Sequence, residues 1–250
     1  MGKIFNPTQK KILQHFLTNF PEVIDAVNHR DFQKVYSLAP KIINNANIYL
    51  VSELLMQYGI NPIEKLGYVP TNFLSHTYDV TFSKIDLSAA SRIDPEAFAG
   101  SGIKEVIGGD NIHLIDTGAF YDSKLMMANF KNVDNLGQSA FAYCRSLKEL
   151  PIKDSYQLVT IPQSCFEKCE SLDEINIPNS VKVIEHRAFA YCGILKKVYI
   201  PAGIEDISPS AFRSCLIREL HFQAGETRFK EMKKINYKLF YGTEIEKVVY

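Results

Sequence analysis

The chain has 250 residues, of which 46% are hydrophobic and 22% are charged, so it can bury a sizeable core. Its 28 Lys and Arg balance 28 Asp and Glu, which excludes the basic excess that binding to nucleic acid or an anionic membrane requires. No stretch approaches the roughly 18 apolar residues of a membrane span, and no secretory signal follows Met1. We therefore predict a cytoplasmic protein, of the source cell or of an infected host cell, that has no nucleic-acid or membrane partner.

The first 68 residues carry no repeat and have the punctuation of helices. Pro7 and Pro21 each stand at a typical first helical position, and Asp31 is a typical N-cap. A fourth helix is predicted over about 47–58. Two interpretations stay open, because this region either caps the apolar end of a following repeat array or is a second binding module.

From residue 69 to residue 250 a short unit recurs, marked by a phenylalanine that usually follows alanine. Successive phenylalanines are 21 to 28 residues apart, within the spacing of roughly 20–29 residues that is typical of leucine-rich repeats. The residue five positions earlier is Ile or Leu, and the residue three positions later is always small. The marker residues are Phe98, Phe120, Phe141, Phe166, Phe189, Phe212 and Phe240.

After each marker phenylalanine, apolar residues alternate as in Leu172-x-x-Ile175-x-Ile177, which predicts a strand with one buried face. The same pattern predicts strands at 125–130 and 147–152. A Ser or Pro before the phenylalanine, as in 208–215, predicts a short helical turn. Met232 and Ile235 fill the positions before the last phenylalanine, so the last unit is expected to follow the same plan.

The copy from Val181 to Pro201 closely resembles the BspA-type leucine-rich repeat, although Glu185 stands where that repeat usually has glycine. The resemblance covers roughly residues 70–250. It implies an α/β fold, a solenoid of about seven units over 69–250 with a parallel β-sheet on one side and short helical turns on the other. The N-terminal region, 1–68, would be an α-helical cap, and a degenerate first copy is expected around Phe73.

Four of the five cysteines occupy the small-residue position of the repeat, and Cys165 replaces the alanine before a phenylalanine. Buried cysteine behaves as a small hydrophobic residue, and this interpretation is favoured over zinc or redox chemistry because no C-x-x-C pair is present. No H-E-x-x-H, G-x-S-x-G or phosphate loop occurs either. The sequence thus predicts no catalytic residue, no metal and no cofactor. The four repeat-position cysteines are Cys144, Cys169, Cys192 and Cys215.

A leucine-rich repeat exposes columns of strand residues on its concave side, and we expect a protein partner to bind there. The alternative is that these positions are merely solvated. The last strand is predicted to be an uncapped edge, through which a homodimer is expected to form by Val248, Val249 and Tyr250. The predicted protein-binding residues are Met126, Met127, Asn129, Lys148, Asn176, Lys196, Lys197, Tyr199, Arg218 and His221.

Three functions compete on these observations. The first, which we predict, is a non-enzymatic protein-interaction module, an intracellular bacterial or phage effector that binds a specific protein. Whether binding inhibits that protein or scaffolds it stays open. The second is a surface or secreted adhesin, as proteins that resemble this repeat type often are, and the missing signal peptide speaks against it. The third is an enzyme without a recognisable motif.

Overall fold

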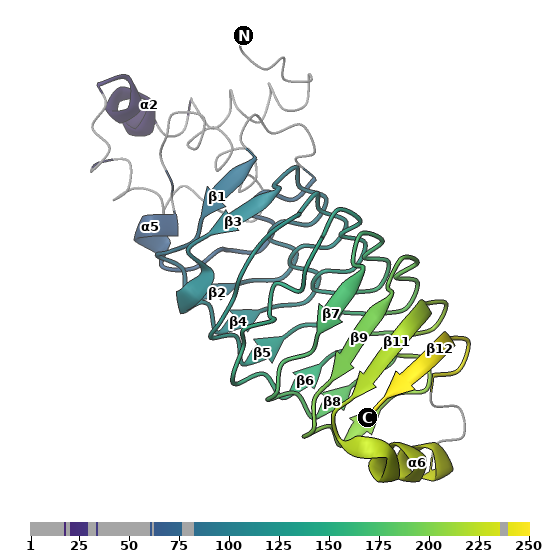
Figure 1. The fold of residues 1–250 in the computed structure, drawn as a ribbon. Helices are drawn as coiled ribbons and strands as arrows, with labels where there is room; N and C mark the ends of the chain where they lie inside the picture. Colours follow the sequence, from purple (N-terminus) through teal and green to yellow (C-terminus); the bar gives the residue numbers. More distant parts are fainter. Residues whose placement is uncertain are drawn as a thin grey trace.

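The structure, a computed structural model, describes residues 18, 21–29, 34, 61, 63–76, 83–235 and 240–250. The chain winds into an elongated solenoid whose successive units stack side by side along one axis (Figure 1). Helix α2 (Pro21–Asn28) and the short α5 (Ile63–Leu66) precede the solenoid. The other predicted N-terminal helices, including those after Pro7 and Asp31 and at 47–58, lie outside the described residues, so the helical cap is not confirmed.

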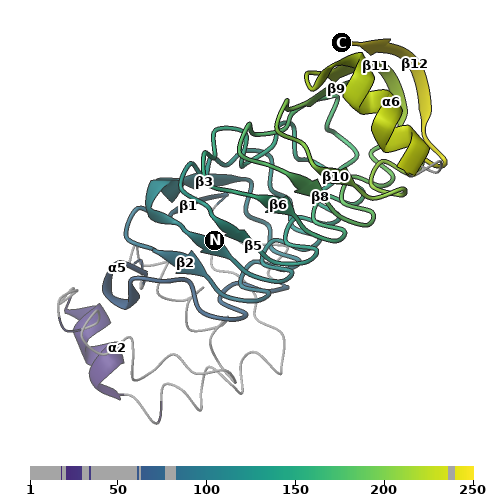
Figure 2. The same ribbon diagram turned by 90° about the horizontal axis from the view of Figure 1, so that it is seen from below.

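Each unit contributes up to two short parallel strands, one on each of two sides of the solenoid (Figures 1 and 2). On the short-strand side lie β2 (Arg92–Ile93), β4 (Leu114–Ile115), β5 (Asn135–Leu136), β6 (Thr160–Ile161), β8 (Val183–Ile184) and β10 (Asp206–Ile207). On the other side lie β1 (Lys84–Asp86), β3 (Glu105–Ile107), β7 (Glu174–Asn176), β9 (Lys197–Ile200), β11 (Leu216–Phe222) and β12 (Glu244–Val249). We call the solvent-facing side of this second set the strand face. A 3-10 turn, η1 (Gly109–Asn111), follows β3.

The marker phenylalanines form a continuous ladder through the core. From Phe98 to Phe212 neighbouring rings stack with centroids 4.9–5.3 Å apart, and all of these rings are fully buried. Phe240 extends the ladder at 5.6 Å. The isoleucines five positions earlier pair in register, for example Ile161 with Ile184. The predicted parallel solenoid is therefore confirmed.

The segments around the ladder, which we call the turn side, are successive β-turns and not the helical turns that the sequence predicted. Glu96 and Gly100, two residues before and after Phe98, have φ values of 56° and 60°, which no right-handed helix contains. The N–H of Phe98 donates to Ala119 O (2.7 Å) and that of Gly100 to Tyr121 O (2.7 Å). These N–H groups bond the next unit, so they are not free for the bonds of a helix.

Two predicted strands are missing from the strand face. Residues 125–130 form only an isolated bridge, Met127 to Glu105, and residues 147–152 form turns. Pro151 has no N–H to donate to the neighbouring unit, and Leu150 O accepts from Lys153 N (3.2 Å) in a turn. The apolar residues of these segments are nevertheless buried. Their alternation in the sequence therefore indicates burial but not the formation of a strand.

The two ends of the solenoid also depart from the repeat pattern. At the start, Leu74 and not Phe73 takes the position of the marker phenylalanine. The N–H of Leu74 donates to Ala97 O (2.7 Å), as the N–H of a marker residue does, while the Phe73 ring meets Phe98 edge-on. Near the other end, residues that matched the repeat belong to helix α6 (Gly225–Ile235) instead, which buries Phe229 and Met232.

Helix α6 packs against the end of the core through Phe229, whose ring contacts Phe222 at 5.1 Å (Figure 2). A C-terminal cap could not be predicted, because the residues of α6 carry apolar positions at spacings that also fit the repeat. The last unit is longer than the others for the same reason: the helix occupies the place of a short strand.

Candidate protein-binding surface

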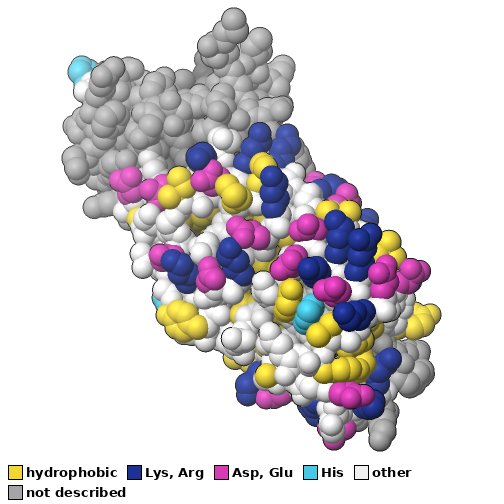
Figure 3. Space-filling model, viewed as in Figure 1, with side chains coloured by type: hydrophobic (Ala, Val, Ile, Leu, Met, Phe, Trp, Pro, Cys, Tyr) yellow, Lys and Arg dark blue, Asp and Glu magenta, His cyan; other side chains and the backbone are white. Residues whose placement is uncertain are grey.

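The predicted surface residues of the last units lie in columns across the strand face. The parallel register aligns Glu174 with Lys197 and Lys197 with Glu219, while Tyr199 lies between Asn176 and His221. Each column repeats at the spacing of parallel strands, about 4.8 Å. Asn176, Lys197, Tyr199 and His221 are thus close neighbours. Figure 3 shows acidic, basic and apolar side chains interspersed over this face.

The middle of this surface is ordered by contacts among its own side chains. The rings of Tyr199 and His221 stack with centroids 4.3 Å apart at 15°. Glu219 Oε2 lies 3.2 Å from His221 Nε2 and 3.9 Å from Lys197 Nζ. Hydrogen bonding to His221, with the nearby charges of Lys197 and Lys247, lowers the pKa of Glu219. The stacked rings form an amphipathic platform held between charges, the kind of rigid anchor that protein interfaces favour.

Beside this platform, at the beginning of β9, β11 and β12, lies a half-open cleft of about 330 Å³. Two large aliphatic side chains border it, Ile194 and Leu216, which are 49% and 55% exposed. Lys196 and Arg218 line it too. Within the described residues neither of these cations forms an ion pair, whereas the adjacent Lys197 pairs with Glu219.

Sequence reasoning found Lys196 and Arg218 but missed Ile194 and Leu216. The signal was present, because each is an apolar residue two positions before one of the cations, outside the buried alternation. The register that aligns Glu219 with Lys197 also places these pairs on neighbouring strands.

The other predicted residues lie further along the solenoid. Met127 is 46% exposed, while Met126 is half-buried. Asn129 is half-buried and donates from Nδ2 to Asp154 Oδ2 (2.9 Å), which ties it to the next unit. Lys148 and Asn176 both line a second, smaller cleft. The structure thus divides the predicted surface into one cluster around Tyr199 and another around Met127.

The residues of the predicted self-association edge lie at the end of the sheet. Strand β12 is last in the order β12-β11-β9-β7, and among the described residues it pairs only with β11. Val248 and Val249 are half-buried. Tyr250 is 52% exposed and its ring meets Phe229 of α6 at 5.8 Å.

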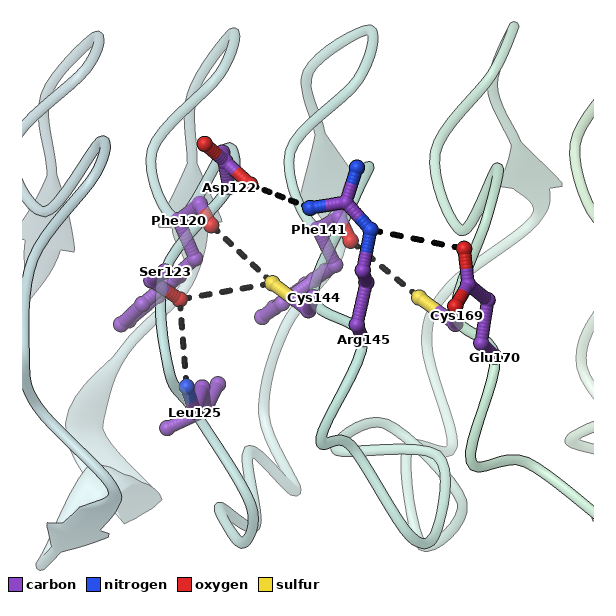
Figure 4. A network of polar contacts seen from close by, with 9 residues as sticks. All are labelled: Phe120, Asp122, Ser123, Leu125, Phe141, Cys144, Arg145, Cys169 and Glu170. Carbon is purple, nitrogen blue, oxygen red and sulfur yellow. Dashed lines mark hydrogen bonds and ion pairs between the residues drawn. The ribbon is translucent and has the colours of Figure 1, made fainter.

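The cysteine column is a ladder of thiols that bond the preceding unit (Figure 4). Cys144 donates from Sγ to Phe120 O (3.0 Å), and Cys169 donates to Phe141 O (3.2 Å). Burial raises the pKa of the Cys144 thiol to about 12. Because the thiolate is the reactive and metal-binding form, this raised pKa keeps the Cys144 thiol in its unreactive form at neutral pH. All five cysteines are free and buried.

A match to a protein-family model agrees with this geometry. The model is described as a BspA type leucine rich repeat region with 6 copies, and it matches residues 69–196 and 156–250. The chain belongs to the BspA-type leucine-rich repeat family. The two matched ranges together cover the solenoid from the unit of Leu74 to that of Phe240.

Solved structures of leucine-rich repeat proteins are similar to parts of this BspA-type repeat chain, and the first of them shares its fold. A leucine-rich repeat protein from Eubacterium ventriosum has 20% identity and a TM-score of 0.50 over 57% of this chain and 45% of its own. One from Bacteroides ovatus has 19% identity and a TM-score of 0.47 over 61% and 46%. A leucine rich cell surface protein from Faecalibacterium prausnitzii has 15% identity and a TM-score of 0.30 over 60% and 62%. The chain therefore spans less than half the length of the first two, and no curated protein matches it.

The turn side of this repeat region carries a second set of ordered side chains that sequence reasoning missed. Lys168 Nζ lies 4.9 Å from the ring centre of Tyr143 and 5.8 Å from that of Tyr191. Arg187 lies over Tyr191 and bonds the buried carboxylate of Glu167. The recurring Ala-Tyr-Cys after the marker phenylalanine was the available signal. These contacts link successive units, which is a structural role.

The described residues hold no group of three or more His, Cys, Asp or Glu arranged to bind a metal ion. In the same part of the chain no helix is long and apolar enough to cross a membrane.

Proposed function

We propose that this chain is a non-enzymatic protein-binding module whose partner contacts the strand face around Tyr199. The observation that carries the proposal is the cleft in which the exposed Ile194 and Leu216 lie beside the unpaired Lys196 and Arg218. An apolar surface bordered by charge is typical of protein interfaces. Membership of the family supports it as well, because leucine-rich repeats of this kind are typically protein-interaction modules and not enzymes.

The chemistry of the cleft narrows the partner. Ile194 and Leu216 offer apolar area, and the cations next to them offer hydrogen bonds to a carboxylate. Glu244 and Glu246 border the other end of the same cleft and disfavour a uniformly acidic ligand. The proposed partner segment therefore presents an aliphatic or aromatic side chain with one carboxylate close to it.

The test begins with a partner captured from the source cell and identified by mass spectrometry. Its affinity for the wild type is then compared by calorimetry with that for the variant Lys196→Glu, Arg218→Glu, Tyr199→Ala. We expect at least a tenfold loss, since each central contact in an interface contributes on the order of 1–2 kcal/mol. A matched control, Lys131→Glu with Lys182→Glu, reverses two exposed charges away from the cleft and should bind as the wild type does. Unchanged affinity of the triple variant would move the interface to residues 1–68.

Two settings are compatible with this binding role. One is the intracellular effector that inhibits a protein of the source or host cell, and the other is a surface or secreted adhesin. Family membership supports the adhesin at least as well as the effector. Fractionation of source cells with an antibody against the chain distinguishes them, because an effector is found in the cytoplasmic fraction and an adhesin on the surface or in the medium.

The proposal extends to a homodimer that pairs through β12, whose edge residues are Val248, Val249 and Tyr250. An open strand edge presents unpaired backbone groups to a second copy. Light scattering should then give a mass that rises toward the dimer with concentration, and Val249→Lys should return it to the monomer. A monomeric mass at high concentration excludes this pairing.

A further inference from the structure

Both sides of the solenoid lack a sheet at one shared junction. On the short-strand side β2, β4 and β5 form one sheet and β6, β8 and β10 another. On the strand face β1 and β3 are separate from the sheet that begins with β7. The gap on the short-strand side lies at the junction between the units of Phe141 and Phe166. The gap on the strand face is longer, because Figure 1 shows no strands there between β3 and β7, and it includes the same junction.

On the short-strand side the cause is a proline. In other units the residue after the short strand donates its N–H to the preceding unit, as Gly137 does to Ile115 O (2.7 Å) and Glu185 does to Ile161 O (2.9 Å). Pro162 holds this position in the Phe166 unit and has no N–H to donate. The bond that would join β6 to β5 therefore cannot form.

On the strand face the 147–152 segment turns away from β7. Leu150 O and Ile152 O accept instead from Lys153 N (3.2 Å) and Ser155 N (2.9 Å). Within the described residues no backbone hydrogen bond joins 147–153 to 172–177. A cleft of about 250 Å³ opens here, between the 148–153 segment and β7.

The turn side is intact across the same junction. Phe141 N donates to Cys165 O (2.9 Å) and Tyr143 N to Glu167 O (2.7 Å), while the Phe141 and Phe166 rings stack at 5.3 Å. Arg145 lies 3.4 Å from Glu170 and spans the junction (Figure 4). Among the described residues the two halves thus share a backbone ladder along the turn side only. Away from it side chains link them, as Ser155 Oγ does by donating to Val133 O (2.8 Å).

From this asymmetry we infer that the solenoid is hinged at the Phe141–Phe166 junction, with the turn side as the axis. Residues 83–146 form one rigid block, and residues 160–235 with 240–250 form the other, because every other junction among the described residues keeps at least one backbone ladder besides that of the turn side. Opening the hinge separates the two clusters of the strand face, Met127 on one block and Tyr199 on the other. Flexing at a few element-terminal residues between packed blocks is a common form of conformational change.

The test replaces the two prolines of this region with residues that other units carry at the same positions. Pro162→Ser copies Ser208 and restores the donor that faces the Phe141 unit, while Pro151→Asn copies Asn176 and lets the 147–152 segment extend as β7 does. Spin labels on Asp110→Cys and Gln223→Cys report the distance between the blocks, and the five native cysteines are buried and stay unlabelled. With these labels in the otherwise wild-type chain we expect a broad distribution of the distances between the two labels. In the double proline variant the width of that distribution should fall by about half. The control, Pro95→Gln, copies Gln163 at an intact junction and should leave the distribution broad.

Hydrogen exchange provides a second measurement that needs no proline variant. Backbone amides in 148–152 and 173–177 should exchange at least about tenfold faster than those in 217–222, since exchange follows local opening. The hinge is wrong if the wild-type distribution is narrow and equal to that of the double variant. If the double variant does not fold, a narrow wild-type distribution with equal protection of 173–177 and 217–222 overturns the inference as well.

Discussion

The turn side and the strand face are built from the same units but differ in regularity. On the turn side the phenylalanine ladder runs from Phe98 to Phe240 without a gap, and the N–H of one unit bonds the next throughout. On the strand face the sheet is interrupted, and the exposed residues change from unit to unit. Stacked repeats need one uninterrupted core for stability, and the remaining surface is free to vary. The difference therefore assigns stability to the turn side and recognition to the strand face.

The largest expected effect follows from a cavity in the ladder. Phe166→Ala removes a fully buried ring that stacks on Phe141 and Phe189. We expect a loss of about 3–5 kcal/mol in the free energy of unfolding, measured by urea titration with circular dichroism. Tyr199→Ala, on the strand face, should cost less than about 1 kcal/mol because the ring is half-buried and stacks only at the surface. Equal losses would contradict the division of roles.

The turn side, which is the regular part of the molecule, could be predicted from the sequence. Ladder positions recur with the same residue types, so Phe189, Ile184 and Cys192 could be placed without any coordinates. Periodicity reports which side chains are buried. It does not report how the backbone groups of those residues are bonded, so the β-turns on the turn side were mistaken for helical turns. Positive φ at Ser139 and Tyr143 is not visible in residue types that rarely adopt it.

The strand face, which is the irregular part, could not be predicted from the apolar pattern alone. Leu147, Leu150 and Ile152 are all buried as the alternation requires, but Pro151 removes the donor that a strand needs at that point. The exposed Ile194 and Leu216 are similar in type to core residues, and only the strand register distinguishes them. The candidate surface was therefore predicted in its columns and charges but not in its apolar cleft.

A smaller effect is expected where neighbouring units approach most closely on the short-strand side. A Cβ at Gly137 would lie 2.1 Å from Thr117 N, too close for any side chain without movement of the backbone. Gly137→Ala should cost about 1–3 kcal/mol in urea unfolding, the range for overpacking. Gly193 is a matched control on the strand face, because a Cβ there meets no atom within 4 Å. Gly193→Ala should change the unfolding free energy by less than about 0.5 kcal/mol, and a comparable loss in both variants would rule out the close approach as the cause.

The smallest of these effects tests the polar links of the turn side. Glu167 is buried, with only 7% of its side chain exposed, and it bonds Arg187, which is 39% exposed. Arg187→Met keeps an unbranched apolar stem but leaves the carboxylate without its cation, at a cost of about 1–2 kcal/mol once solvent screening of the exposed arginine is allowed for. The control Lys182→Met breaks a surface pair with Glu205 in which both side chains are more than half exposed, and should leave the free energy of unfolding unchanged. A neutral Arg187→Met would show that the phenylalanine and thiol ladders hold the turn side together without help from the charges that cross it.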